Sequence, residues 1–168
     1  DSARVVVPWG STIDEAVAKL DEEITEPSVL VGLSLGGILA MAYTRWHPDK
    51  VSGLVLMATN AKGPTDAQIE GWQKGIAELG STADTRGFQK GLLPLLLSPA
   101  SQKSEDIVNA TLESAAALPS ACLIEQLNMQ QTRIDERPYL SQVSVPVEIL
   151  AGRHDALCPI SNHEEILE

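Results

Sequence analysis

Residues 28–46 read SVLVGLSLGGILAMAYTRW, and this stretch decides the fold. It begins with a short apolar run, residues 28–33, which is typical of a buried strand. The following residues, 35–46, are apolar nearly all round and predict a helix, which Pro48 ends. Between the two stands Ser34. The stretch therefore predicts a strand, a tight turn and a helix, with a serine at the turn.

The turn carries the pattern Gly-x-Ser-x-Gly, formed by Gly32, Ser34 and Gly36. A nucleophilic serine on such a turn is lifted above the sheet by a strained backbone, so we expect a positive φ at Ser34. The chain then doubles back so closely that side chains at Gly32 and Gly36 would collide, and Gly37 leaves room where the helix meets a strand. The N–H of Leu35, at the positive end of the helix, can donate to an oxyanion. A tight glycine turn with an idle serine is the alternative.

Strands and helices alternate on both sides of this stretch. Apolar runs at residues 3–7, 51–58 and 145–151 predict further strands, and residues 12–24 and 159–167 have the pattern of helices. The strands are continuous apolar runs rather than alternating ones. The pattern therefore indicates the α/β class, with a mostly parallel sheet covered by helices on both faces.

Residues 60–140 interrupt the alternation. Apolar residues at helical spacing predict four short helices there, although a crossover between two strands needs only one. We interpret this segment as a helical cap, or lid, inserted into an α/β core made of residues 1–59 and 141–168. A helical subdomain that contacts no site is the alternative. The four predicted helices lie around residues 69–79, 88–97, 107–115 and 123–129.

Composition restricts the partners of the chain. Twelve Lys and Arg against 23 Asp and Glu give a formal charge of −11, and the aromatic residues are 3 Trp, 2 Tyr and 1 Phe. Such a chain repels phosphate and offers few rings for stacking, so we expect no nucleic acid. No apolar run reaches the ~18 residues of a membrane span, and no signal peptide opens the sequence, so we expect a cytoplasmic protein with no membrane partner.

The two cysteines, Cys122 and Cys158, are 36 positions apart and belong to no Cys or His cluster. A zinc site is therefore not expected, and both cysteines are interpreted as reduced core thiols.

Residues 29–59, with the glycine-serine turn inside them, resemble the core of α/β-hydrolase-fold proteins. Residues 145–155 (VPVEILAGRHD) are similar to the strand and loop that present the acid of the Ser-His-Asp triad in this family. The resemblance implies that Asp155 is this acid, and the chain order Ser34 then Asp155 agrees with the family's order of Ser, acid, His. A loop aspartate that caps the next helix is the alternative. The short links suggest a compact member, among the small esterases, thioesterases and enol-lactonases.

The resemblance also implies parts that this sequence does not show. In the family, the base follows one more helix and one more strand, and the first three strands and the loop with the second oxyanion donor come before the region that starts here. His47 is expected at the surface, His154 lies beside the acid, and His163 falls in the helix after it, so we expect none of them to be the base. The fold is thus expected to be incomplete at both ends, and residues 1–168 alone to be inactive.

The function that this pattern predicts is hydrolysis of a carboxylic ester, thioester or lactone. Ser34 would attack the carbonyl, a histidine outside residues 1–168 would take its proton, and Asp155 would hold that histidine. The expected partner is a small-molecule acyl substrate, with no cofactor and no metal, and a homodimer stays open. The rival interpretation is a non-catalytic ligand-binding or interaction protein on the same scaffold.

Overall fold

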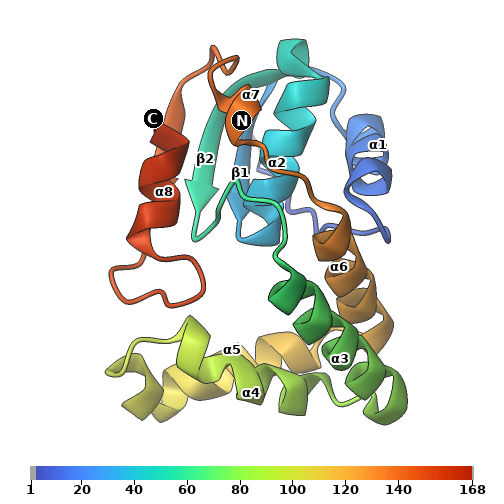
Figure 1. Ribbon diagram of the computed structural model, residues 1–168, viewed down its shortest axis with the longest axis vertical. Coiled ribbons are helices and arrows are strands. Elements are labelled where there is room, and N and C mark those ends of the chain that lie inside the picture. Colours follow the sequence, from blue (N-terminus) through green and yellow to red (C-terminus); the bar gives the residue numbers. More distant parts are fainter. Residues whose placement is uncertain (1–2, 168) are drawn as a thin grey trace.

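In the computed structural model, which describes residues 3–167, a small parallel sheet packs against helices, and a helical layer lies beyond the carboxyl ends of its strands (Figure 1). Within the described residues the sheet has three strands in the order β1-β2-β3. The strands are β1 (Ser28–Leu33), β2 (Val51–Met57) and β3 (Val147–Leu150). The α-helices are α1 (Ile13–Glu23), α2 (Leu35–Trp46), α3 (Asp66–Thr82), α4 (Thr85–Leu96), α5 (Glu105–Ala116), α6 (Ser120–Thr132), α7 (Arg137–Leu140) and α8 (Ile160–Leu167), with 3-10 turns η1 (Pro48–Lys50) and η2 (Ser101–Lys103).

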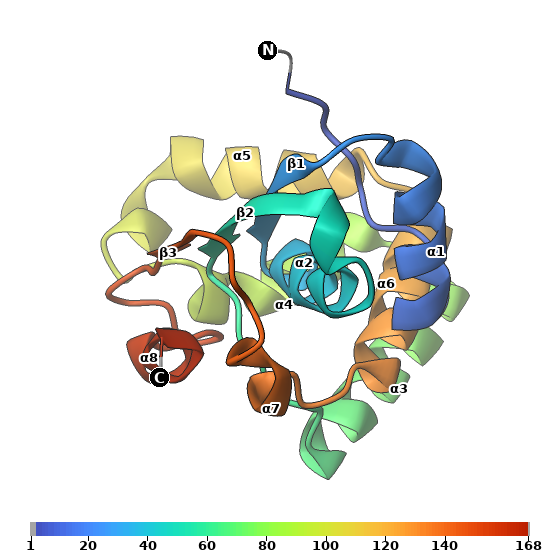
Figure 2. The same ribbon diagram turned by 90° about the horizontal axis from the view of Figure 1, so that it is seen from above.

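The core lies between the sheet and α2. The register places Leu30 beside Leu54, and Leu56 beside Ile149, so apolar side chains of all three strands share one face of the sheet. Leu54 and Leu56 are buried on this face, and α2, which packs against it, buries nine of its twelve residues. Figure 2 shows α1, α2, α7 and α8 on this side of the strands. The apolar character of α2 follows from this central position, as the sequence predicts.

The opposite face of the sheet is open. Val29, Val31 and Leu33 of β1 point away from α2, and Val31 is 63% exposed. The α/β class and the parallel sheet are confirmed, but within residues 3–167 helices cover one face where the sequence predicts both. The outer edge of β1 also has no neighbouring strand among these residues.

The strand expected at residues 3–7 is not formed, and that prediction is wrong. These residues have no regular secondary structure, and Val5 is 91% exposed. A β-branched run favours extended backbone, but a strand also needs a neighbour that takes its hydrogen bonds. Among residues 3–167, β1 pairs with β2 alone, so the run at residues 3–7 lacks that neighbour.

Residues 60–140 are mostly helical, as predicted. The helix α3 begins at a capping box, in which the Thr65 hydroxyl accepts the Gln68 N–H and the Gln68 side chain accepts the Thr65 N–H. The pattern predicts the positions of α3–α6, whereas the single turn α7 is missed. Figure 1 shows α4 and α5 below the carboxyl ends of the strands.

No single helix within residues 3–167 has the length and apolar character needed to cross a membrane. The pair α5 and α6 passes that test together, by length and composition only, and a bend of 91° separates the two helices.

Candidate active site

Ser34 occupies the turn between β1 and α2, with φ 52° and ψ −114°. The positive φ predicted for this residue is confirmed. A non-glycine residue in this region stores strain on the order of 1–3 kcal/mol, which the surrounding structure has to hold. The holding contacts begin with the Ser34 N–H, which donates to the Met57 carbonyl at 2.8 Å. This bond joins the turn to the end of β2.

The three glycines around Ser34 differ in how much space a side chain would find beside them. A Cβ at Gly32 would lie 2.5 Å from the Gly36 carbonyl oxygen, and one at Gly37 would lie 2.7 Å from the Thr59 side chain. At both positions the close approach of neighbouring atoms excludes a side chain, as the sequence predicts. A Cβ at Gly36 would meet nothing within 4 Å, so the collision expected there is wrong. The tight contact runs from the Gly32 side to the backbone of residue 36, while the Cβ direction of Gly36 points into open space.

The helix α2 begins directly at this turn. Leu35 is its first residue, and the first N–H groups of a helix have no acceptor inside the helix. Gly37 and Ile38 donate instead to the Ser34 carbonyl, at 2.9 and 3.2 Å. The N–H of Leu35 and the positive end of the helix dipole thus stand beside Ser34, as an oxyanion donor requires.

Asp155 stands half-buried in the loop that follows β3. Its Oδ1 accepts the N–H groups of Leu157, at 2.9 Å, and Cys158, at 2.8 Å. The aspartate therefore fixes its own loop and does not cap α8, which begins at Ile160. The hydrogen bonds that define this loop leave the second carboxylate oxygen for another partner.

Ser34 and Asp155 follow two strands that flank β2 on the same edge of the sheet. Two strand spacings amount to about 10 Å, which is too far for direct contact between the two side chains. The loop after β3 also reaches the helical layer, where the Ala156 N–H donates to the Leu95 carbonyl of α4 at 3.3 Å. The carboxyl edge of the sheet thus brings together Ser34, Asp155 and one helix of the predicted cap.

His163 is buried, and both of its ring nitrogens are engaged. The Nε2 atom accepts the Thr59 N–H at 3.1 Å, and Nδ1 lies 3.1 Å from the Pro159 carbonyl. Because Nε2 accepts, the ring proton is assigned to Nδ1, which donates to Pro159. This arrangement leaves no ring nitrogen free to take a proton from Ser34.

The other two histidines are also placed away from a base position. His47 ends α2 at the opposite end from Ser34, stacks on Tyr43 with 4.7 Å between ring centroids, and has Nδ1 3.5 Å from Asp21. His154 is exposed beside Asp155. Among residues 3–167, the structure therefore brings no histidine between the serine and the acid.

Sequence reasoning misses Thr59. This residue is fully buried just past β2, where its hydroxyl donates to the Ser34 carbonyl at 2.8 Å and its N–H donates to His163. Ala58, before it, has a φ of 44° and turns the chain out of the strand. The one available signal is its place at the carboxyl end of a strand next to β1.

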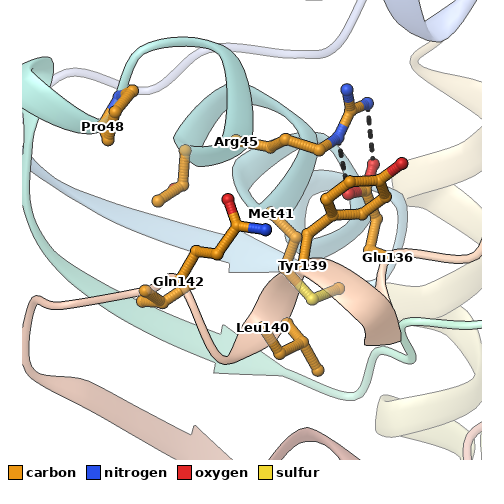
Figure 3. A pocket seen from close by; sticks show the side chains of 9 residues that line it. Met41, Arg45, Pro48, Glu136, Tyr139, Leu140 and Gln142 are labelled. Atoms are coloured by element: carbon orange, nitrogen blue, oxygen red, sulfur yellow. Dashed lines mark hydrogen bonds and ion pairs between the residues drawn. The ribbon is translucent and has the colours of Figure 1, made fainter.

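A cavity of about 90 Å³ lies between α2 and the segment around α7, far from Ser34 (Figure 3). Arg45 and Glu136 form an ion pair in its wall, and Tyr139 lies beside the guanidinium. Arg45 is eleven residues along α2 from Ser34, which is about 16 Å of helix. This cavity belongs to the packing of α7 and not to the serine.

Arg133, at the end of α6, is 6% exposed and has no carboxylate partner among the described residues. Its guanidinium donates to Gln130 at 2.7 Å and to Gln68 at 3.2 Å, and lies 5.1 Å from the centroid of the Trp72 ring. Within residues 3–167 its Nε atom has no hydrogen-bond partner. Burial lowers the pKa of this arginine.

Residues 3–167 hold no group of three or more His, Cys, Asp or Glu side chains that could bind a metal ion.

Comparison with known proteins identifies relatives of this chain by sequence. The chain is 33% identical over 157 residues to a pimeloyl-[acyl-carrier protein] methyl ester esterase of Aliivibrio salmonicida, a match that covers 88% of this chain and 58% of that protein. It is 22% identical over 162 residues to 3-oxoadipate enol-lactonase 2 of Acinetobacter baylyi, covering 92% of this chain and 56% of that one. The chain thus spans somewhat more than half the length of these curated relatives.

Solved structures share the fold. A thermophilic esterase from Thermogutta terrifontis superposes with a TM-score of 0.85 at 21% identity, over 96% of this chain and 61% of that one. The enol-lactonase from Burkholderia xenovorans superposes with a TM-score of 0.76 at 20% identity, over 95% and 62%. A family model described as serine aminopeptidase, S33 matches residues 11–168. On this match and the shared architecture, the chain belongs to that hydrolase family, within the α/β-hydrolase superfamily.

Proposed function

We propose that the protein hydrolyses a carboxylic ester, thioester or lactone, with Ser34 as the nucleophile. The observation that carries this proposal is the strained turn at Ser34, with positive φ between a strand and the helix α2. The relatives described as a methyl ester esterase and an enol-lactonase support the choice of an ester-type bond. In this reaction the Ser34 oxygen bonds to the acyl carbon, and the alcohol or thiol leaves with the proton taken from Ser34. Water then releases the acid.

Asp155 is the proposed acid of the triad, and the base is a histidine outside residues 1–168. The gap of about 10 Å between the strands that carry Ser34 and Asp155 is wide enough for an imidazole between the two side chains. The engaged nitrogens of His163 and the positions of His47 and His154 support a base from elsewhere. The N–H of Leu35 is the proposed oxyanion donor within this chain.

The helices of residues 60–140 are proposed to cover this site as a lid. Their place beyond the carboxyl ends of the strands supports the assignment, as does the bond between Ala156 and Leu95. Such a lid shapes the acyl pocket and excludes water.

One observation favours the rival function, a ligand-binding or interaction protein without catalysis. The described residues place no histidine between Ser34 and Asp155, and a triad without its base loses most of its rate. The mass of the protein isolated from its source separates the two functions at once. A mass well above the 18.0 kDa of residues 1–168 leaves room for the base.

The test uses the intact gene product and a panel of p-nitrophenyl esters of rising acyl chain length. We expect turnover that Ser34→Ala abolishes and Asp155→Asn lowers by on the order of 10⁴-fold. Ser28→Ala is the matched control, because Ser28 lies at the other end of β1 and its hydroxyl donates to the backbone carbonyl of Glu26. A leucine p-nitroanilide in the same panel tests the peptidase activity named in the family description. Turnover that survives Ser34→Ala would contradict the proposal.

A further inference from the structure

The turn that holds Ser34 is tied to the loop that holds Asp155 by a buried chain of hydrogen bonds. The Thr59 hydroxyl donates to the Ser34 carbonyl at 2.8 Å, and the Thr59 N–H donates to His163 Nε2 at 3.1 Å. His163 Nδ1 donates to the Pro159 carbonyl at 3.1 Å. Pro159 follows Cys158, whose N–H donates to Asp155 at 2.8 Å. One path of polar contacts therefore leads from the serine to the acid.

Both side chains in this path are enclosed. Thr59 is fully buried and His163 nearly so, and each polar atom they contribute has a partner. A fully satisfied buried network has one favoured geometry, because each lost bond leaves a group unpaired in a dry interior. The path is thus a rigid link between the turn at Ser34 and the loop at Asp155.

Ser34 needs such a link because its backbone is strained. Its carbonyl already accepts two N–H groups of α2, and Thr59 adds a contact from the segment just past β2. The Thr59 side chain also fills the space that a Cβ at Gly37 would occupy, at 2.7 Å. Thr59 therefore limits both the rotation of the serine peptide and the sliding of α2 along the sheet.

From these contacts we infer that Thr59 and His163 are positioning residues for the proposed reaction. They hold the Ser34 hydroxyl and the Asp155 carboxylate at a fixed separation, into which the base fits. Neither touches the substrate, and His163 acts as a neutral ring that accepts from Thr59 and donates to Pro159. The inference rests on the proposed function, because it assigns these residues a part in the same reaction.

The experiment compares Thr59→Val with Thr59→Ser in the intact gene product. Valine keeps the shape and loses the hydroxyl, whereas serine keeps the hydroxyl. We expect Thr59→Val to lower kcat by on the order of 10- to 100-fold with KM within twofold of wild type, because misplaced reacting groups slow the chemical step. Thr59→Ser is expected to restore most of kcat. For His163, Gln retains an acceptor for Thr59 and should keep more kcat than Leu.

Thr44→Val is the matched control. Thr44 is also buried, and its hydroxyl donates to the Ala40 carbonyl at 2.7 Å in the same helix, but it has no contact with Ser34. This variant loses a comparable bond and should keep kcat within twofold. If Thr59→Val and His163→Leu also keep kcat within twofold while lowering the melting temperature, the link serves the fold alone and the inference is wrong.

A second measurement separates this inference from the proposed function. The ¹⁵N spectrum of the His163 ring, read in the intact protein, should show a protonated Nδ1 and an unprotonated Nε2, and Thr59→Val should shift the amide signals of Ser34 and Leu35. A wild-type protein that hydrolyses no ester would overturn the proposed function, even with these signals present. A protonated Nε2, or unmoved Ser34 signals, would overturn the link even in an active enzyme.

Discussion

Arg45 and Glu136 are 91 positions apart in the sequence and form a two-point ion pair in the interior. Arg45 Nε lies 2.8 Å from Glu136 Oε2, and its Nη2 lies 3.1 Å from Oε1. The Glu136 side chain is 4% exposed. The ring centroids of Trp46 and Tyr139 lie 5.0 and 5.1 Å from the guanidinium carbon of Arg45.

Replacing Arg45 by Met should lower the free energy of unfolding by about 3–5 kcal/mol, because it leaves the Glu136 carboxylate buried without a counter-charge. Urea denaturation measures this change. The double variant Arg45→Met with Glu136→Leu should regain most of the loss, since both charges are then absent. A double variant as unstable as Arg45→Met would show that packing around the guanidinium, and not the abandoned charge, is responsible.

Arg133 offers the contrasting case. It is buried, whereas Arg45 is half-buried, and its partners are the neutral amides of Gln68 and Gln130. Arg133→Met removes a buried charge and leaves no carboxylate without a counter-charge. We therefore expect the free energy of unfolding to stay within about 1 kcal/mol of wild type or to rise. The same urea titration measures it. A loss equal to that of Arg45→Met would mean that the amide bonds and the Trp72 contact outweigh the cost of burial.

Two adjacent glycines of the serine turn should respond differently to alanine. A Cβ at position 37 meets the Thr59 side chain at 2.7 Å, so Gly37→Ala should cost about 1–3 kcal/mol of stability through overpacking. A Cβ at position 36 meets nothing within 4 Å, so Gly36→Ala should be neutral or slightly stabilising in the first turn of α2. Thermal unfolding of both variants gives the comparison. Equal losses would show that the turn itself requires glycine at position 36.

The two cysteines should react slowly with thiol reagents in the native state. Burial raises the pKa of both Cys158 and Cys122. A raised pKa leaves less thiolate at a given pH, so reaction with Ellman's reagent near pH 8 should be slow and should accelerate as pH increases further. Unfolding in urea should make both thiols react quickly. Fast reaction of one native thiol would point to a local opening of the helices around Cys122 or of the loop at Cys158.

A protein made only of residues 1–168 should hydrolyse p-nitrophenyl acetate near the background rate. The described histidines are placed away from the base position, and a triad without its base retains roughly 10³–10⁴-fold over water at most. The second oxyanion donor is also expected outside these residues, and the loss of one such donor costs roughly a further 10²–10³ in rate. Ser34→Ala should therefore leave this rate unchanged. A rate that depends on Ser34 would mean that His154, His163 or a histidine of a second copy completes the site.

The sequence predicts those parts of this fold that depend on local pattern. The strand, turn and helix around Ser34 follow from an apolar run, a glycine pattern and a proline, and α2 begins and ends where these residues indicate. The prediction for residues 3–7 is wrong because a strand there needs a neighbouring strand to pair with, and the local sequence pattern does not report whether one is present.

The parts of the site that escape prediction are contacts between distant segments. Thr59 and His163 are 104 positions apart, and their bond depends on how β2 and α8 are placed by the whole sheet. The open space beside Gly36 is likewise a property of packing. Residue types near a strand end can suggest such contacts, but only the assembled fold selects which of them form.

The exposed row on β1 governs how residues 1–168 would behave as a concentrated sample. Val29, Val31 and Leu33 form an exposed apolar strip beside a strand edge that pairs with no other strand in the described part of the chain, and such a surface favours colloidal attraction between molecules. Light scattering of such a sample should give a negative second virial coefficient that salt makes more negative, despite a formal charge of −11 on each molecule. A single Val31→Lys exchange, at a position that is 63% exposed, would weaken the attraction while leaving the packed face intact.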